Sequence, residues 1–123
     1  MNVLFAEDYR PLQALISELL NREGHSVEVF DDGRALLARL DSENSFGAIV
    51  TDHSMPFVTG LEVLRHVRKD ARFEHVPVVV CSTDDNPVFA SHIGKEGGVF
   101  VWKSSDIKTL SSKLHAAITT KRR

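Results

Sequence analysis

The stretch Val76-Pro77-Val78-Val79-Val80-Cys81-Ser82 decides the fold of this chain. Its three consecutive valines favour a β-strand, because β-branched side chains pack well on a pleated surface. The run does not alternate with polar residues, which is typical of a parallel strand that is buried on both faces. We therefore predict a central strand over residues 76–81, with Ser82 at its carboxyl end.

The same arrangement, a short apolar run followed by an amphipathic helical pattern, occurs five times along the chain. Apolar residues three and four positions apart indicate the helices. The predicted strands cover residues 3–6, 27–30, 48–50, 76–81 and 99–102, and the predicted helices lie around residues 12–20, 36–40, 59–67, 87–93 and 107–118. Five such units predict an α/β fold, a doubly wound five-stranded parallel sheet with helices on both faces. The strand at residues 27–30 alternates, which favours the sheet edge.

Length, charge and cysteine content limit the possible functions. The chain has 123 residues and a formal net charge of −2, which fits a single domain and argues against direct nucleic-acid binding. Cys81 is the single cysteine, so an internal disulfide framework and a multi-cysteine zinc site are excluded. The apolar run before Glu7 is too short for a signal peptide or a membrane span. We expect a cytoplasmic protein without membrane insertion.

Chemically active residues follow four of the predicted strands. Glu7 and Asp8 follow the first strand, and Asp52 follows the third. Ser82 ends the fourth strand, and Lys103 follows the fifth. The carboxyl ends of parallel strands lie at one rim of the sheet, where doubly wound folds bind their ligands. We therefore expect three acids, a hydroxyl and an ammonium group to converge there.

The charges of this set indicate a divalent cation. Three carboxylates in one depression repel each other, and each pKa rises unless a cation compensates. A divalent cation together with Lys103 cancels the charge of −3, and carboxylate oxygens suit Mg²⁺. A site with Mg²⁺, a carboxylate nucleophile, a hydroxyl and a lysine is suited to phosphoryl transfer.

The stretch Asp52-His53-Ser54-Met55-Pro56, followed by Gly60-Leu61-Glu62, resembles the segment around the phosphorylated aspartate of response regulator receiver domains. The acidic pair, the strand end at residues 77–82 and Phe100-Val101-Trp102-Lys103 also fall where this family of two-component signalling has its other parts. The resemblance covers all 123 residues. It implies a CheY-like, flavodoxin-like fold with five helices and strand order 2-1-3-4-5. We expect one receiver domain over residues 1–123 without an output domain.

The resemblance implies a phosphoacceptor site around a magnesium ion. Asp52 would accept a phosphoryl group from a sensor histidine kinase or a phosphotransfer protein. Asp8 and Asp52 would ligate Mg²⁺ directly, Glu7 through water, and Ser54 with its backbone carbonyl. The domain would not be an enzyme beyond its own phosphorylation and dephosphorylation.

The resemblance also implies a switch that reads the phosphorylated state. Ser82 would turn its hydroxyl to the phosphoryl group, Lys103 would pair with it, and Phe100 would move between two rotamers. The surface of the fourth helix, fifth strand and fifth helix would then bind an unidentified downstream protein or a second copy of the chain.

Two features depart from the family pattern. Ser104 follows Lys103 where the family usually has proline after a cis peptide bond. A cis bond before a non-proline residue costs about 3 kcal/mol, so we expect a trans bond. The stretch from Ser82 to Lys103 is one residue short, and we place the deletion in the fourth helix or the turn after it.

Several residues allow more than one interpretation. Thr83 is an alternative to Ser82 as the switch residue. Phe100 is either mobile or an ordinary core residue, and Trp102 is either a partner contact or a packed edge residue. Asp84 either affects how water reaches the acyl phosphate or caps the fourth helix.

The histidines and the cysteine are predicted to have no chemical role. His53 adjoins Asp52, but the two-residue period of a strand points it away, so we interpret it as a surface spectator. Cys81 is interpreted as an inert core thiol. The remaining histidines are interpreted as surface residues: His25, His66, His75, His92 and His115.

Two other functions remain open from the sequence. A degenerate receiver would serve only as a docking module, although such domains typically lose an acid or the lysine. A Mg²⁺-dependent phosphohydrolase would usually carry a second acid two residues beyond its nucleophile, and this chain has Ser54 there.

Overall fold

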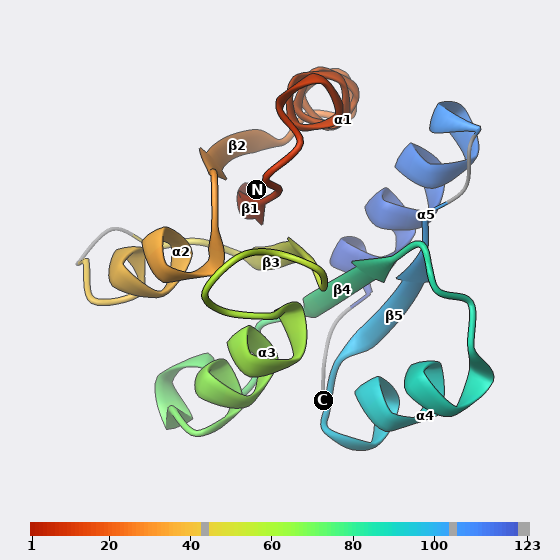
Figure 1. Ribbon diagram of the computed structural model, residues 1–123. Helices are drawn as coiled ribbons and strands as arrows, with labels where there is room; N and C mark the ends of the chain where they lie inside the picture. The colour runs from red at the N-terminus through yellow and green to blue at the C-terminus, as the bar shows by residue number, and fades with distance from the viewer. Residues whose placement is uncertain (43–44, 104–105, 121–123) are drawn as a thin grey trace.

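The computed structural model describes residues 1–42, 45–103 and 106–120, and these form one parallel sheet covered by helices (Figure 1). The strand order is β2-β1-β3-β4-β5, which confirms the predicted fold class and places the alternating strand at an edge. The strands are β1 (Asn2–Ala6), β2 (Ser26–Phe30), β3 (Ala48–Asp52), β4 (Val78–Ser82) and β5 (Val99–Trp102).

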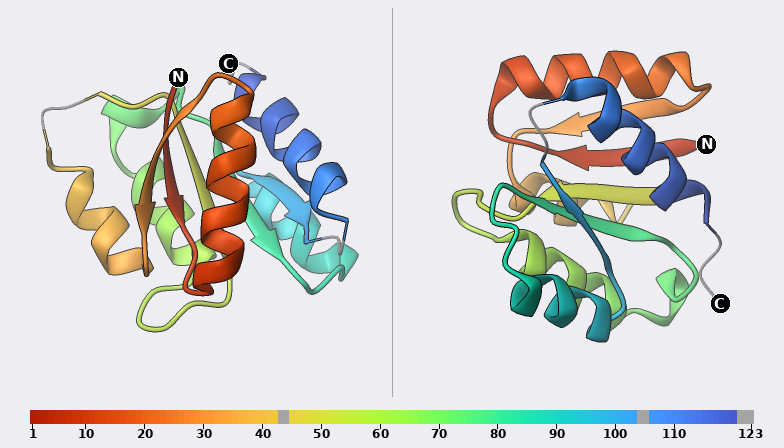
Figure 2. Two further views of the ribbon diagram at one scale, coloured as in Figure 1. Left: turned by 90° about the horizontal axis from the view of Figure 1, so that it is seen from above. Right: turned by 90° about the vertical axis from the view of Figure 1, so that its right-hand side faces the viewer.

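The helices form two layers, one on each face of the sheet. In Figure 2, α1 and α5 lie on one side of the strands, and α3 and α4 lie on the other. The helices are α1 (Arg10–Arg22), α2 (Gly33–Arg39), α3 (Gly60–Arg68), α4 (Pro87–Lys95) and α5 (Ile107–Thr119), with a short 3₁₀ turn at Ala71–Phe73. None of the described helices is long and apolar enough to cross a membrane.

Alternate residues of each inner strand supply two separate cores. Val3 and Phe5 of β1 pack with residues of α1 and α5, whereas Leu4 and Ala6 pack with residues of α2, α3 and α4. All residues of β3 and β4 are buried, as expected for strands that are covered on both faces. The sheet is therefore a rigid base for the loops at its carboxyl edge.

The helix ends follow the local signals of the sequence, with one correction. Asp32 caps α2 through Ala35 N–H, and Thr59 and Glu62 form a capping box at the start of α3. The cap of α4 is Asn86, which accepts from Val88 N–H, and not Asp84. Asp84 accepts from the backbone of Asn86 instead and so shapes the turn before the helix.

The prediction that His25 is a surface residue was wrong. His25 is buried directly before β2, and its Nε2 lies 2.8 Å from Nδ1 of His115 on α5. Nδ1 of His25 lies 3.3 Å from the amino group of Met1, and Nε2 of His115 lies 3.9 Å from Glu23. Helices α1 and α5 cover the same face of the sheet, and this brings together two histidines that are 90 residues apart.

Candidate functional site

The candidate site lies at the carboxyl edge of the sheet, between β1 and its neighbour β3. Glu7 directly follows β1, Asp52 ends β3, and Lys103 directly follows β5. The Nζ of Lys103 lies 2.5 Å from Oε1 of Glu7 and 3.0 Å from Oδ1 of Asp52. Glu7 is 1% exposed and Asp52 is 6% exposed, so this shared ion pair is largely removed from water.

Asp8 completes a cluster of three acids. Glu7, Asp8 and Asp52 each offer a carboxylate oxygen, and these oxygens all lie within 4.8 Å of one another. Lys103 compensates one of the three negative charges, which leaves −2. Hard oxygen donors and a residual charge of −2 fit a Mg²⁺ ion, which binds through one or two carboxylates and keeps several waters.

Burial sets the electrostatics of these side chains. It raises the pKa of Glu7 and of Asp52, and Lys103 opposes both shifts without cancelling them. Burial alone would lower the pKa of Lys103, but its contacts with Glu7 and Asp52 outweigh this and raise it. A cluster in which one lysine leaves two buried acids with raised pKa values has room for further positive charge.

Ser82 lies on the same rim but bonds within its own loop. It is the buried last residue of β4, and its Oγ accepts a hydrogen bond from Asp84 N–H at 3.0 Å. Thr83 is exposed, and its carbonyl accepts from Nε1 of Trp102 at 3.2 Å. Lys103 N–H donates to the carbonyl of Ser82 at 2.8 Å, so Ser82 and Lys103 are tied through the backbone.

Phe100 and Trp102 lie two residues apart on the edge strand β5 and therefore on the same face of it, whereas Val101 between them packs into the opposite core. Phe100 is half-buried against the core beneath α3 and α4, and its ring meets Phe89 of α4 edge-on at 5.8 Å. Trp102 is 43% exposed. The two positions thus have the burial that a movable aromatic and an accessible aromatic need.

The chain between β3 and α3 approaches Asp52 closely. A Cβ atom on Gly60 would lie 2.7 Å from the carbonyl oxygen of Asp52, so only glycine fits there. Phe57 has φ of 71°, and Arg34 of α2 lies 3.4 Å above its ring. Ser54 lies in this loop, exposed and two residues after Asp52.

His53 does not lie free at the surface as the sequence predicted, although its interpretation as a spectator stays a prediction. It is half-buried, its Nδ1 accepts from Leu61 N–H at 3.3 Å, and its ring lies 4.6 Å from that of Phe89. The strand period correctly turns the side chain away from its neighbour. The sequence carries no signal that α4 covers it there, because Phe89 lies 36 residues later.

Cys81 is buried, and burial raises the pKa of its thiol to about 12. This confirms the prediction of an inert core thiol, since a protonated thiol is a poor nucleophile. The predicted trans bond between Lys103 and Ser104 lies outside the described residues.

Comparisons with known proteins agree with this arrangement. The family model for the response regulator receiver domain matches residues 3–115. Chemotaxis protein CheY of Pseudomonas aeruginosa is 33% identical over 118 residues, which make up 93% of this chain and 93% of that protein. The two-component response regulator ORR7 of Oryza sativa subsp. japonica is 30% identical, and this chain spans 55% of its length.

Solved structures have the same fold. The chemotaxis response regulator CheY4 of Vibrio cholerae matches with a TM-score of 0.84 and 26% identity, over 94% of this chain and 97% of that chain. This chain therefore belongs to the receiver domain family of two-component response regulators.

Membership of the family has direct consequences. Receiver domains are signalling domains and not classical enzymes, and they bind Mg²⁺ at an acidic pocket. They interact with histidine kinases or phosphotransfer proteins and with downstream targets. In this chain Glu7, Asp8 and Asp52 form an acidic group that could hold a metal ion.

Proposed function

We propose that the protein is a phosphorylation-dependent switch in which Asp52 is the phosphoacceptor. The observation that carries the proposal is the contact of one lysine with two buried acids, beside a third acid, at the carboxyl edge of the sheet. An oxygen of Asp52 attacks the phosphorus of a phosphohistidine. The new O–P bond gives an acyl phosphate, the P–N bond breaks, and the released imidazole takes up a proton.

The residues that would hold Mg²⁺ are Asp8 and Asp52 directly, Glu7 through water, and Ser54 through its backbone carbonyl. Bound there, Mg²⁺ would neutralise carboxylate charge and the phosphoryl oxygens. Glu7 already accepts from Lys103 Nζ and from Tyr9 N–H, which supports an indirect role for its carboxylate. Lys103 pairs with both Glu7 and Asp52, which supports a role in which it would contact an incoming phosphoryl oxygen.

The same rim would convert phosphorylation into a change of surface. A phosphoryl group brings a charge of about −1.5 to −2 and three acceptor oxygens. These attract the hydroxyl of Ser82, which would then give up its hydrogen bond from Asp84 N–H. Phe100 fills the space that Ser82 leaves, and the surface of α4, β5 and α5 changes its affinity for a downstream protein. The phosphoryl donor, a histidine kinase or a phosphotransfer protein, implies a cytoplasmic location.

The proposal is tested by incubation with Mg²⁺ and acetyl phosphate, followed by intact-mass analysis. We expect the mass gain of one phosphoryl group, its loss in Asp52→Asn, and its retention in the control Asp85→Asn, whose side chain lies exposed before α4. No gain, under conditions that label a known receiver domain, would leave only a docking function. Steady turnover of a phosphoester at ordinary enzyme rates would instead indicate a phosphohydrolase.

Ser82→Ala tests the switch separately from the acceptor. The variant keeps the acids and Lys103, so it should still gain phosphate in the same assay. It should transmit poorly, because the hydroxyl that follows the phosphoryl group is gone. A full phosphorylation-induced rise in partner affinity in Ser82→Ala would contradict the assignment of Ser82 and favour Thr83.

A further inference from the structure

Three aromatic rings connect the acceptor strand to the fourth helix and the fifth strand. The ring of His53, directly after Asp52, lies 4.6 Å from the ring of Phe89 with an interplanar angle of 56°. Phe89 in turn meets Phe100 edge-on at 5.8 Å. Tilted and edge-on rings within about 4.5–7 Å attract each other beyond simple burial. Phe89 therefore contacts both the acceptor loop and the residue assigned to the switch.

The backbone of His53 is fixed on the acceptor side. Its N–H donates to the carbonyl of Cys81 at 2.8 Å, and its own carbonyl accepts from Met55 N–H and Gly60 N–H. A displacement of Asp52 is thus passed to His53 through the peptide bond that they share. Asp52 is itself paired with Cys81 of the neighbouring strand β4, so β4 holds the backbone on both sides of this peptide bond.

The imidazole of His53 is fixed as well. Its Nδ1 accepts from Leu61 N–H, in the first turn of α3, at 3.3 Å. An accepting Nδ1 requires the tautomer that carries its proton on Nε2. The ring is therefore held at one edge by α3 while its face and other edge remain available to Phe89. The side chain joins three elements: the end of β3, the start of α3 and the first half of α4.

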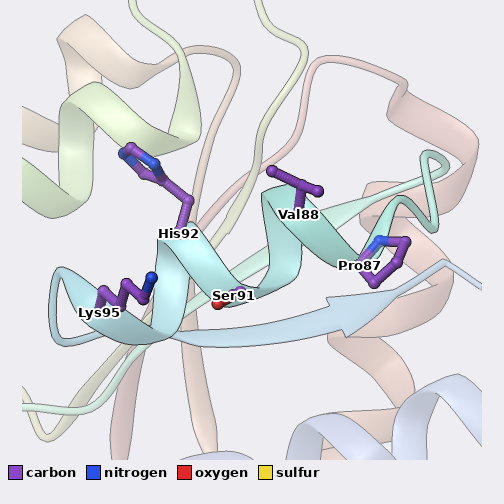
Figure 3. A pocket seen from close by; sticks show the side chains of 5 residues that line it. All are labelled: Pro87, Val88, Ser91, His92 and Lys95. Atoms are coloured by element: carbon purple, nitrogen blue, oxygen red, sulfur yellow. The ribbon is translucent and has the colours of Figure 1, made fainter.

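The second half of α4 is held differently. His92 points from α4 toward α3 (Figure 3). Its Nε2 lies 2.6 Å from Oε2 of Glu96 and 3.2 Å from Nη2 of Arg65. Arg65 also pairs with Glu96 at 2.6 Å. This exposed polar cluster anchors the end of the helix to α3, whereas Phe89 and His53 connect its beginning to the acceptor.

We propose that His53 is a positioning residue that couples Asp52 to α4 through its ring contact with Phe89. This route differs from the one that runs through Ser82 and Phe100, because it starts at the backbone of the acceptor strand and needs no hydroxyl movement. The inference rests on the proposed function of Asp52 as the phosphoacceptor.

The two contacts of His53 can be removed one at a time. His53→Phe keeps a ring against Phe89 and loses the acceptor for Leu61 N–H. His53→Asn keeps an acceptor near the position of Nδ1 and loses the ring. Phe89→Leu removes the ring from the other side and leaves His53 intact. A role in folding alone would make the three variants differ in stability but not in their response to phosphorylation.

The experiment measures hydrogen exchange of residues 87–95 by mass spectrometry, with Mg²⁺ alone and with Mg²⁺ and acetyl phosphate. Intact mass is recorded on the same samples, so that only phosphorylated protein is compared. We expect a phosphorylation-induced change in the wild type, and we expect His53→Phe to retain most of it. His53→Asn and Phe89→Leu should each lose at least half of the change at equal phosphate content.

Each outcome separates this inference from the proposed function. Full wild-type changes in both His53→Asn and Phe89→Leu would overturn the ring contact as a route, while Asp52 remains the acceptor. A wild type that gains phosphate without any change in hydrogen exchange of residues 87–95 would also overturn the ring contact as a route. A wild type that gains no phosphate would overturn both proposals. If His53→Asn does not fold, His53→Leu decides the result, because it also removes the ring and leaves the contact between Phe89 and Phe100 in place.

Discussion

The two ends of the sheet differ in whether their charged groups are compensated within the protein. At the amino end of β4 and β5, Arg68 of α3 donates to the carbonyls of Phe73, Val76 and Gly97 at 3.0, 2.7 and 3.0 Å. Each of these guanidinium donors of Arg68 is therefore paired with a backbone carbonyl oxygen in the turns before β4 and β5. At the carboxyl end, Lys103 is the one cation among the described residues that pairs with Glu7 and Asp52, and Asp8 adds a third acid beside them.

This difference indicates which charged groups stabilise the fold and which belong to a ligand site. A polar group whose partners are supplied by the fold stabilises it, because no buried donor or acceptor is left unpaired. An excess of one sign of charge at a buried position costs stability, and a fold tolerates it where a ligand supplies the opposite charge. At the amino end, the fold itself supplies the partners of Arg68. At the carboxyl end, the excess of negative charge fits a site where a ligand supplies the positive charge.

The largest effect on stability is expected for Lys103→Met. Removing the lysine leaves Glu7, 1% exposed, without a cation, and breaking a buried pair in this way costs about 3 kcal/mol of the free energy of unfolding. Urea unfolding at pH 7 with a metal chelator measures the loss. Lys113→Met, at an exposed position of α5, is the control. Equal midpoints for the two variants would contradict the assignment of Lys103 as the compensating charge.

Arg68→Met tests the amino end. Three backbone carbonyls would lose a charged donor, which should lower the free energy of unfolding by about 2 kcal/mol. Urea unfolding measures it, and phosphorylation of Asp52 by acetyl phosphate should continue. Loss of phosphorylation in an Arg68→Met variant that remains folded would contradict the claim that Arg68 stabilises the fold without contributing to the site.

Asp8→Asn should have a smaller effect of opposite sign. Without metal, the variant loses repulsion with Glu7 and Asp52 at an exposed position, and it should gain about 0.5 kcal/mol. Addition of Mg²⁺ should raise the melting temperature of the wild type more than that of the variant, because Asp8 contributes to binding. The same Mg²⁺-induced increase in both proteins would show that Asp8 is no ligand.

The smallest effect concerns the paired histidines at the amino end. Burial lowers the pKa of His25 below its ordinary value of 6.5; Met1 and His115 add to this, and Glu23 opposes it. The folded protein then binds fewer protons than the unfolded chain just below pH 6.5, so stability falls as pH decreases through that window. His25→Asn should flatten this fall in thermal melts between pH 7 and 5. His75→Asn, at an exposed site, should not.

Much of the fold could be predicted because its signals are local. The valine run of β4, the alternation of β2 and the Thr59–Glu62 box each depend on a few adjacent residues. The acids of the site could be predicted for a related reason: each lies at the end of a strand, and parallel strands bring their ends together.

The errors concern contacts between residues that are distant in the sequence. His25 contacts His115 because α5 packs beside the start of β2, and His53 contacts Phe89 because α4 packs beside the end of β3. The alternative that Asp84 caps α4 was wrong for a local reason, because the cap is Asn86, two residues later, and sequence signals are weakest at helix ends.

A crystal structure with Mg²⁺ and beryllofluoride, which imitates a phosphoryl group, tests the central claim most directly. We predict density for the metal among Glu7, Asp8 and Asp52, and density for the beryllofluoride on a carboxylate oxygen of Asp52, within reach of Lys103. Metal or beryllofluoride density at another place, with the Asp52 carboxylate left unmodified, would contradict it.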